Sequence, residues 1–224
     1  DAVVMERLLP WIGGFSTSSV FEAKLARSVL DVAPSSRRRS IHVTSPGISD
    51  REIGELGNLC DHVALNSLSQ LWRLGPRLER PGQCGLRINP GLSLVADDRY
   101  NPCRQYSKLG APLDAVKREL AQHPERFSKL QGVLVHTNCD SSDFAPLVRT
   151  IEHLEQSLGN WLGSLDWINL GGGYLFEPSA EAEVASLARA VERLRDHHGL
   201  TVFLEPGAAL VREAGFLVAE VIDL

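Results

Sequence analysis

Short apolar runs alternate with longer amphipathic stretches along the chain. The short runs are nearly continuous in apolar residues, which is typical of strands buried on both faces of a parallel sheet. The predicted strands are 11–17, 41–44, 62–66, 85–89, 132–137, 167–170 and 202–205. Apolar residues at helical spacing predict helices between them, at 1–9, 19–32, 67–78, 113–123, 144–158 and 180–197. Asp50 is expected to cap a further short helix, and a long polar loop is expected at 91–110.

This alternation predicts an α/β fold of the (β/α)8 TIM-barrel type, which closes with eight parallel strands. The pattern opens with a helix, so the missing first strand is expected upstream of Asp1. We assign residues 1–213 to the barrel, partial at its N-terminus, and 214–224 to the start of an absent C-terminal β domain. An open doubly wound sheet is the rival architecture. The strand number and the lack of an N-terminal G-x-G-x-x-G motif argue against it.

Composition narrows the classes of function. The 224 residues are 43% hydrophobic and carry a formal net charge of -5. Lys and Arg are scattered, so no surface for nucleic acid is expected. No apolar stretch reaches the roughly 18 residues of a membrane span, and no signal-peptide pattern opens the chain. The four cysteines lack the spacing of metal ligands, so we expect no metal site, no disulfide framework and a cytoplasmic location.

Polar residues gather at the ends of the predicted strands, where barrels of this type build their active sites. They are Ser16, Thr17, Ser18, Thr44, Asn66, Arg87, Asn89, His136, Asn138, Gly171, Gly172, Gly173 and Glu205. The His136 side chain could be a hydrogen-bonding core residue, or its flat ring could stack on a flat cofactor. The nearby Cys139 could be a small packing group or a substrate contact.

Two of these features point to a phosphorylated, ring-shaped ligand. Gly171, Gly172 and Gly173 would expose consecutive backbone N–H groups, a geometry that cradles a phosphate, although a flexible turn is the alternative. Glu205 ends an apolar strand, where an unpaired carboxylate is costly. Its partner could be a pyridinium nitrogen or the guanidinium of Arg87.

Motifs in a fixed order along nearly the whole chain carry a resemblance. They include Ser-Ser-Val-Phe-Glu at 18–22, Leu-Asn-Ser-Leu-Ser-Gln at 65–70, Gly-Leu-Arg-Ile-Asn-Pro at 85–90, Tyr-Asn-Pro-Cys at 100–103, Ser-Lys-Leu-Gly at 107–110, His-Thr-Asn-Cys at 136–139, Asn-Leu-Gly-Gly-Gly at 169–173 and Leu-Glu-Pro-Gly at 204–207. Together they resemble the carboxynorspermidine decarboxylases, which belong to the alanine racemase-like, fold type III enzymes that use pyridoxal phosphate.

The resemblance implies a role for each matching residue. Pyridoxal phosphate would be bound by Arg87, His136, Gly171, Gly172, Gly173, Glu205 and Gly207. Two of these would be catalytic: His136 would stack on the pyridine ring and Glu205 would pair with the ring nitrogen. The substrate would be contacted by Asn101, Cys103, Ser107, Asn138, Cys139 and Tyr174. The lysine that binds the cofactor aldehyde is expected upstream of Asp1, and a homodimer interface is expected to complete the site.

The implied reaction is decarboxylation at the α-carboxylate of a carboxylated polyamine, such as carboxynorspermidine or carboxyspermidine. Tyr174 stands where the family usually has His, and Asn138 where it often has an apolar residue, which leaves the exact substrate open. A diaminopimelate- or ornithine-type decarboxylase and a racemase are alternatives within the same fold type. A catalytically inactive homologue that keeps the barrel, or a phosphosugar-binding barrel enzyme, are alternatives outside it.

Overall fold

The computed structural model describes residues 1–33, 38–95, 97–176, 181–212, 214–216 and 218–221. Its strands form one sheet in the order β1-β2-β3-β4-β6-β7-β8, with the short strand β5 paired to β4. All neighbouring strands are parallel. The strands are β1 Gly14–Thr17, β2 Ser40–Thr44, β3 His62–Leu65, β4 Cys84–Asn89, β5 Ala111–Pro112, β6 Gly132–Leu134, β7 Trp167–Asn169 and β8 Thr201–Phe203.

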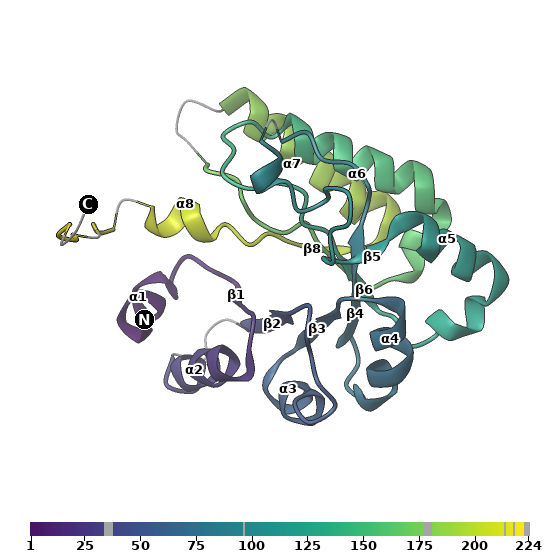
Figure 1. Ribbon diagram of the computed structural model, residues 1–224, viewed down its shortest axis with the longest axis horizontal. Helices are drawn as coiled ribbons and strands as arrows, with labels where there is room; N and C mark the ends of the chain where they lie inside the picture. Colours follow the sequence, from purple (N-terminus) through teal and green to yellow (C-terminus); the bar gives the residue numbers. More distant parts are fainter. Residues whose placement is uncertain (34–37, 96, 177–180, 213, 217, 222–224) are drawn as a thin grey trace.

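Helices surround this curled sheet, and β1 and β8 lie at its two ends (Figure 1). The helices are α1 Ala2–Leu8, α2 Val20–Asp31, α3 Ile53–Leu59, α4 Leu68–Leu74, α5 Leu113–Gln122, α6 Ala145–Leu158, α7 Glu181–His198 and α8 Gly207–Val211. Short 3₁₀ turns are η1 Gly75–Arg77, η2 Asp98–Tyr100, η3 Pro124–Phe127 and η4 Gly159–Ser164. The described chain is therefore a partial (β/α)8 barrel, which confirms the predicted fold class.

Local sequence signals start the helices that follow β1 and β3. The Ser19 hydroxyl accepts a hydrogen bond from the N–H of Glu22 (3.2 Å), and Ser67 does the same for Gln70 (3.2 Å). The side chain of Gln70 reaches back to accept the N–H of Asn66 (2.8 Å). Such reciprocal caps satisfy N–H groups that the first helical turn leaves without partners. They also fix the strand-to-helix turns that carry polar residues to the mouth of the barrel.

The interior of the barrel is filled around one tryptophan. Trp167 on β7 is 2% exposed, and its indole N–H donates to the carbonyl oxygen of Gly82 (2.7 Å). A Cβ added at Gly85 or Gly132, on the neighbouring strands β4 and β6, would overlap the Trp167 ring. Glycine at these two strand positions therefore makes room for the ring against the backbone.

Most predicted elements are confirmed, and the departures lie at their ends. Strand β1 begins at Gly14, not at residue 11, and the Trp11 side chain is 82% exposed. Asp50 caps no helix: α3 follows Glu52, and the Asp50 carboxylate forms ion pairs with Arg73 and Arg77. A cap preference is local, whereas two arginines that come close only in the fold bind this carboxylate.

The C-terminal run also differs from its predicted β structure. Residues 214–216 and 218–221, the described part of that run, form no strand, and Phe216 is 97% exposed. The short helix α8 precedes the run and was not predicted. Residues 180, 217 and 222–224, which belong to the predicted final helix and tail, lie outside the described residues. The assignment of 214–224 to a second domain stays a prediction.

Two features of the described residues bear on other classes of protein. None of the helices there combines the length and apolarity that a bilayer crossing requires. The same part of the chain brings together no three His, Cys, Asp or Glu side chains in a group that could hold a metal ion.

Candidate active site

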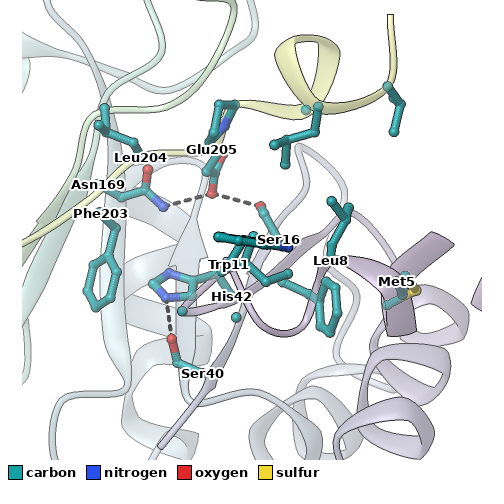
Figure 2. A pocket seen from close by; sticks show the side chains of 18 of the residues that line it. Met5, Leu8, Trp11, Ser16, Ser40, His42, Asn169, Phe203, Leu204 and Glu205 are labelled. Atoms are coloured by element: carbon teal, nitrogen blue, oxygen red, sulfur yellow. Dashed lines mark hydrogen bonds between the residues drawn. The ribbon is translucent and has the colours of Figure 1, made fainter. Parts of the chain in front are cut away.

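The carboxylate of Glu205 lies where three strands end. Glu205 follows β8, and its Oε1 accepts hydrogen bonds from the Ser16 hydroxyl on β1 (2.7 Å) and from Nδ2 of Asn169 on β7 (2.7 Å) (Figure 2). Its Oε2 accepts no hydrogen bond from the described residues, and no ion pair there joins it to Arg87. The carboxylate is thus held by neutral donors, and one of its oxygens remains available.

The three glycines form a turn that packs closely against the main chain of two neighbouring loops. Gly171 (φ 72°) and Gly173 (φ 89°) lie in the left-handed region, which favours glycine. A Cβ at Gly172 would overlap the carbonyl oxygen of Glu205, and one at Gly173 would overlap that of Asn138. The turn therefore requires glycine because the loops after β6, β7 and β8 pack backbone against backbone.

The prediction that all three glycines expose their N–H groups is wrong for the first two. The N–H of Gly171 donates to Oδ1 of Asn169 (2.9 Å), and that of Gly172 donates to Nδ1 of His136 (3.2 Å). The N–H groups of Gly173 and Tyr174 donate no hydrogen bond within the described residues. Any phosphate cradle in this turn accordingly begins at Gly173, two residues later than expected, and includes Tyr174.

His136 is a neutral, oriented ring. Burial, followed by the positive charge of Arg87, lowers its pKa from 6.5 to about 4. Because Nδ1 accepts the N–H of Gly172, the proton of the neutral ring sits on Nε2, which lies 3.7 Å from Sγ of Cys139. The Gly172 contact fixes both the tautomer and the plane of the imidazole.

Arg87 supplies positive charge to the same region. It lies on β4 and is 9% exposed, and burial lowers its guanidinium pKa, which the nearby carboxylate of Glu205 raises in part. Its guanidinium forms neither a hydrogen bond nor an ion pair with another described residue. A buried cation without a counter-ion is costly, so this position favours an anionic or electron-rich ligand.

The loop at 91–110, which was predicted to contact the substrate, makes several contacts with residues at the mouth of the barrel. The Asn66 side chain donates to the carbonyl oxygen of Lys108 (2.8 Å) and accepts the N–H of Gly110 (2.9 Å). The Cys103 thiol lies 3.9 Å from the carbonyl oxygen of His136. Of the predicted loop residues, Cys103 thus reaches the candidate site.

Other predicted substrate residues make local bonds that shape the loop itself. Asn101 donates to Asp98 and accepts the N–H of Cys103 (2.8 Å). The Ser107 hydroxyl donates to the carbonyl oxygen of Pro102 (2.6 Å). These contacts give both side chains a role in loop folding, which sequence alone did not indicate.

The remaining predicted residues lie behind the glycine turn. Asn138 is 4% exposed and accepts the N–H of Cys139 (2.9 Å). Tyr174 is 2% exposed and stacks on Phe144, with ring centroids 5.4 Å apart, and its buried hydroxyl has no hydrogen-bond partner within the described residues. The N–H of Gly207 donates to the carbonyl oxygen of Glu205 (2.8 Å) and stabilises the turn that follows β8.

A cavity of about 570 Å³ opens between β1 and β8 (Figure 2). Residues of α1, β1, β8 and α8 give it a largely apolar wall, and Ser16, Asn169 and Glu205 form a polar part of its lining. His42 and Ser40 line it as well, and the Ser40 hydroxyl lies 3.0 Å from Nε2 of His42. Glu205 therefore lines this cavity, whereas Gly171, Gly172 and Gly173 are not among its lining residues.

Sequence reasoning missed Ser16 and Asn169 as partners of Glu205, and Asn66 as the anchor of the loop. Ser16 and Asn66 were recognised as residues at strand ends, and Asn169 as part of the Gly-Gly-Gly motif. That position at the carboxyl end of a strand was the available signal. Which side chains meet depends on strand order and curvature, which the sequence pattern does not specify.

These residues fit pyridoxal phosphate. The turn at Gly173 and Tyr174 offers free N–H groups to an anion, Oε2 of Glu205 is available to a ring nitrogen, and the His136 ring is buried and oriented beside them. Residues 8–212 match the family described as "Pyridoxal-dependent decarboxylase, pyridoxal binding domain". The chain belongs to this family, whose cofactor is pyridoxal phosphate.

Three individual comparisons identify the decarboxylases to which the chain is similar. The chain is 30% identical to the carboxynorspermidine/carboxyspermidine decarboxylase of Campylobacter jejuni, over 96% of this chain and 52% of the relative. It is 32% identical to the carboxyaminopropylagmatine decarboxylase of Synechocystis, over 96% of this chain and 53% of the relative. The crystal structure of carboxynorspermidine decarboxylase complexed with norspermidine from Campylobacter jejuni matches with a TM-score of 0.75 at 25% identity, covering 93% of this chain and 50% of that one. The chain thus spans about half the length of the curated relatives it matches.

Proposed function

We propose that this chain is the cofactor-binding part of a decarboxylase that removes the α-carboxylate of a carboxylated polyamine such as carboxynorspermidine or carboxyspermidine. Three relatives named for substrates of this kind match 96–99% of the chain. The diaminopimelate and ornithine decarboxylases match 58–80% of it. The broader match favours the polyamine substrate over the two alternatives.

One observation carries the proposal: the fixed carboxylate of Glu205 and the glycine turn lie together at the mouth of the barrel. The main-chain N–H of Glu205 donates to the carbonyl oxygen of Gly171 (2.8 Å). A carboxylate and an N–H-lined turn held at one place suit a ligand that has a basic ring nitrogen and a phosphate.

Each residue has a separate task in this proposal. The N–H groups of Gly173 and Tyr174 would hold the phosphate, and Oε2 of Glu205 would accept a hydrogen bond from the protonated ring nitrogen. The neutral ring of His136 packs on the face of the cofactor ring. When bound, the cofactor withdraws the electrons that remain on the substrate carbon after carbon dioxide leaves.

The loop at 91–110 borders the part of the mouth that we assign to the substrate. Arg87 places a positive charge near Cys103 and Cys139, where it can attract the carboxylate of an incoming amino acid. The Asn66 contacts keep the loop at this position. We propose Cys103, Cys139 and Asn138 as residues that shape the substrate pocket, with Asn101, Ser107 and Tyr174 supporting them from behind.

Substrate profiling of the whole protein tests the proposal. Carbon dioxide release should be measured with carboxynorspermidine, carboxyspermidine, diaminopimelate and ornithine in the presence of pyridoxal phosphate. The proposal expects kcat/KM for a carboxylated polyamine to exceed that for the two amino acids by at least about tenfold, about 1.4 kcal/mol of transition-state binding. Higher kcat/KM with diaminopimelate or ornithine would assign the protein to that type of decarboxylase.

Borohydride reduction of the same preparation separates an enzyme from an inactive homologue. We propose that the reduced cofactor becomes attached to a lysine upstream of Asp1 and that peptide mapping locates it there. Attachment to no lysine, together with no carbon dioxide release from any substrate, would identify an inactive homologue.

The setting of the enzyme is also a proposal. The four cysteines are free in the structure, which suits a reducing compartment such as the cytoplasm. A homodimer, which the resemblance implies, is also proposed. Light scattering of the purified protein measures its mass in solution, and a monomer that is fully active would contradict the dimer.

A further inference from the structure

We propose that Ser16 and Asn169 are positioning residues, which hold the Glu205 carboxylate in one orientation so that its Oε2 faces the ring nitrogen of the cofactor. This inference rests on the proposed function, because it concerns the same carboxylate. It goes further by assigning the orientation to two neutral side chains from two other strands.

The geometry of the two hydrogen bonds supports this role. A carboxylate can rotate about the bond that joins it to its side chain, and one donor would still permit much of that rotation. Here both donors, each 2.7 Å away, converge on the same oxygen from β1 and β7. Convergence from two directions defines the plane of the carboxylate and directs Oε2 away from both donors.

The neutrality of the donors matters as much as their position. A lysine or arginine bonded to Oε1 would neutralise the carboxylate and weaken its attraction for a protonated ring nitrogen. Ser16 and Asn169 fix the group without supplying a charge. Arg87 interacts with Glu205 electrostatically and forms no ion pair with it in the described structure.

Asn169 also couples the carboxylate to the glycine turn. Its Nδ2 donates to Glu205 while its Oδ1 accepts the N–H of Gly171, and Gly171 in turn accepts the N–H of Glu205. These three bonds close a small network around a side chain that is 1% exposed. The places proposed for the ring nitrogen and for the phosphate are therefore held at a fixed spacing.

Ser16 has a competing interpretation that the experiment must exclude. Ser16 is exposed on an edge strand, and its bond to Glu205 spans the space between β1 and β8. The bond could serve only to hold those two strands together. A structural tie would affect every ligand of the site equally, whereas a positioning residue would affect only ligands that contain the ring nitrogen.

Two probes without an aldehyde make that distinction. Pyridoxine phosphate carries the ring nitrogen, and its carbocyclic analogue has a CH group in that position. Neither can bond covalently to a lysine. Their dissociation constants should be measured by calorimetry with the whole protein, free of cofactor, and with variants Ser16→Ala, Ser16→Thr, Asn169→Ala and Glu205→Ala.

The proposal expects a selective loss. Ser16→Ala should weaken binding of pyridoxine phosphate by about five- to tenfold, the effect of one hydrogen bond to a charged group, and leave the carbocyclic analogue unchanged. Asn169→Ala also removes the acceptor of the Gly171 N–H, so it should weaken both probes, and pyridoxine phosphate by the larger factor. Ser16→Thr keeps the hydroxyl and should bind both probes as the parent does. Ser18→Ala is the matched control, because it removes a hydroxyl bond to a different glutamate, Glu22 (2.9 Å), outside the site.

The outcomes separate this inference from the proposed function. If Glu205→Ala does not reduce the preference for pyridoxine phosphate, the pairing of Glu205 with the ring nitrogen is wrong. If Glu205→Ala reduces it but Ser16→Ala weakens both probes equally, or neither, Ser16 is not a positioning residue and the inference fails alone. Should Asn169→Ala not fold, the comparison of Ser16→Ala with Ser16→Thr decides.

Discussion

The charge of Glu205 is central to the proposed chemistry, and it can be removed with little change in shape. Glu205→Gln keeps an oxygen that can accept the bonds from Ser16 and Asn169. It should lower kcat by about 10²- to 10⁴-fold, since a neutral amide does not stabilise a proton on the ring nitrogen. Steady-state kinetics with the preferred substrate measures the loss, and Glu22→Gln is the matched control. Activity within about twofold of the parent would contradict the assigned role.

His42 makes stability depend on pH. Burial, followed by the neighbouring His62, lowers the His42 pKa from 6.5 to about 3. Below about pH 6.5 the unfolded chain binds a proton at His42, whereas the folded protein binds one only near pH 3. The stabilisation is therefore fully present above pH 6.5 and is lost as the pH falls.

This difference in proton binding should make the free energy of unfolding depend on pH. The free energy of unfolding should decrease by about 1.4 kcal/mol per pH unit from His42 alone between about pH 6 and pH 4. Urea unfolding at several pH values measures the slope, and His42→Gln should reduce it by that amount. An identical slope in the variant would show that His42 titrates alike in both states.

The polar residues at the mouth of the barrel could be predicted from the sequence, but the hydrogen bonds among them could not. Glu205, His136 and Arg87 were identified because polar residues at strand ends meet at the mouth of a barrel. The partners of Glu205 were missed, since Asn169 lies 36 positions away and the bond depends on how far the sheet curls. The glycines were recognised for their N–H groups, yet two of those groups bind Asn169 and His136 within the chain itself.

At the scale of elements, the Trp167 ring that packs against β6 requires glycine at position 132. In Gly132→Ala, the new methyl group would overlap the Trp167 ring, which is buried and hydrogen-bonded to Gly82. We expect a loss of about 1–3 kcal/mol in the free energy of unfolding, the usual effect of overpacking a core. Urea unfolding measures it.

Gly54→Ala is the control for that substitution. Gly54 is exposed on α3, and the nearest atom to a new Cβ would be a guanidinium nitrogen of Arg77 at 3.9 Å. Alanine should stabilise this helix by up to about 1 kcal/mol. Equal effects of the two substitutions would show that the fit between β6 and Trp167 is not specific.

The loop at 91–110 depends on Asn66 for its position. Asn66→Ala removes the bonds to Lys108 and Gly110, so the loop should open more often. We expect KM to rise by about tenfold, with a smaller change in kcat, and amide hydrogen exchange at residues 101–110 to accelerate. Ser69→Ala, on the neighbouring helix α4, should change neither. Unaltered exchange in Asn66→Ala would mean that other contacts hold the loop.

Elements were predictable where the pattern is long, and less so where an end depends on tertiary contacts. Buried strands such as β4 and β7 are evident from continuous apolar residues. The start of β1 was placed too early, because an apolar run does not reveal where pairing with β2 begins, at Gly14 opposite Ser40. The cap at Asp50 was wrong because Arg73 and Arg77 approach it only in the folded chain.

For the whole molecule, we expect bound cofactor to increase the free energy of unfolding. A ligand that binds only the folded state adds about 2.7 kcal/mol at a hundredfold excess over its Kd. Pyridoxal phosphate at that excess should therefore raise the urea midpoint of the whole protein, and Glu205→Ala should diminish the rise. An unchanged midpoint would contradict cofactor binding at this site.

The curled sheet brings the first and last strands of the described barrel to the same cavity. The bond from Ser16 to Glu205 joins positions 189 residues apart. Contacts between such distant positions form late, because nearby segments associate first and closing a long loop costs more entropy. A chain still emerging from the ribosome, with β8 not yet made, has no completed site. Capture of the cofactor would then mark the end of folding, and the rate at which cofactor binding appears after dilution from denaturant would report the last step of assembly.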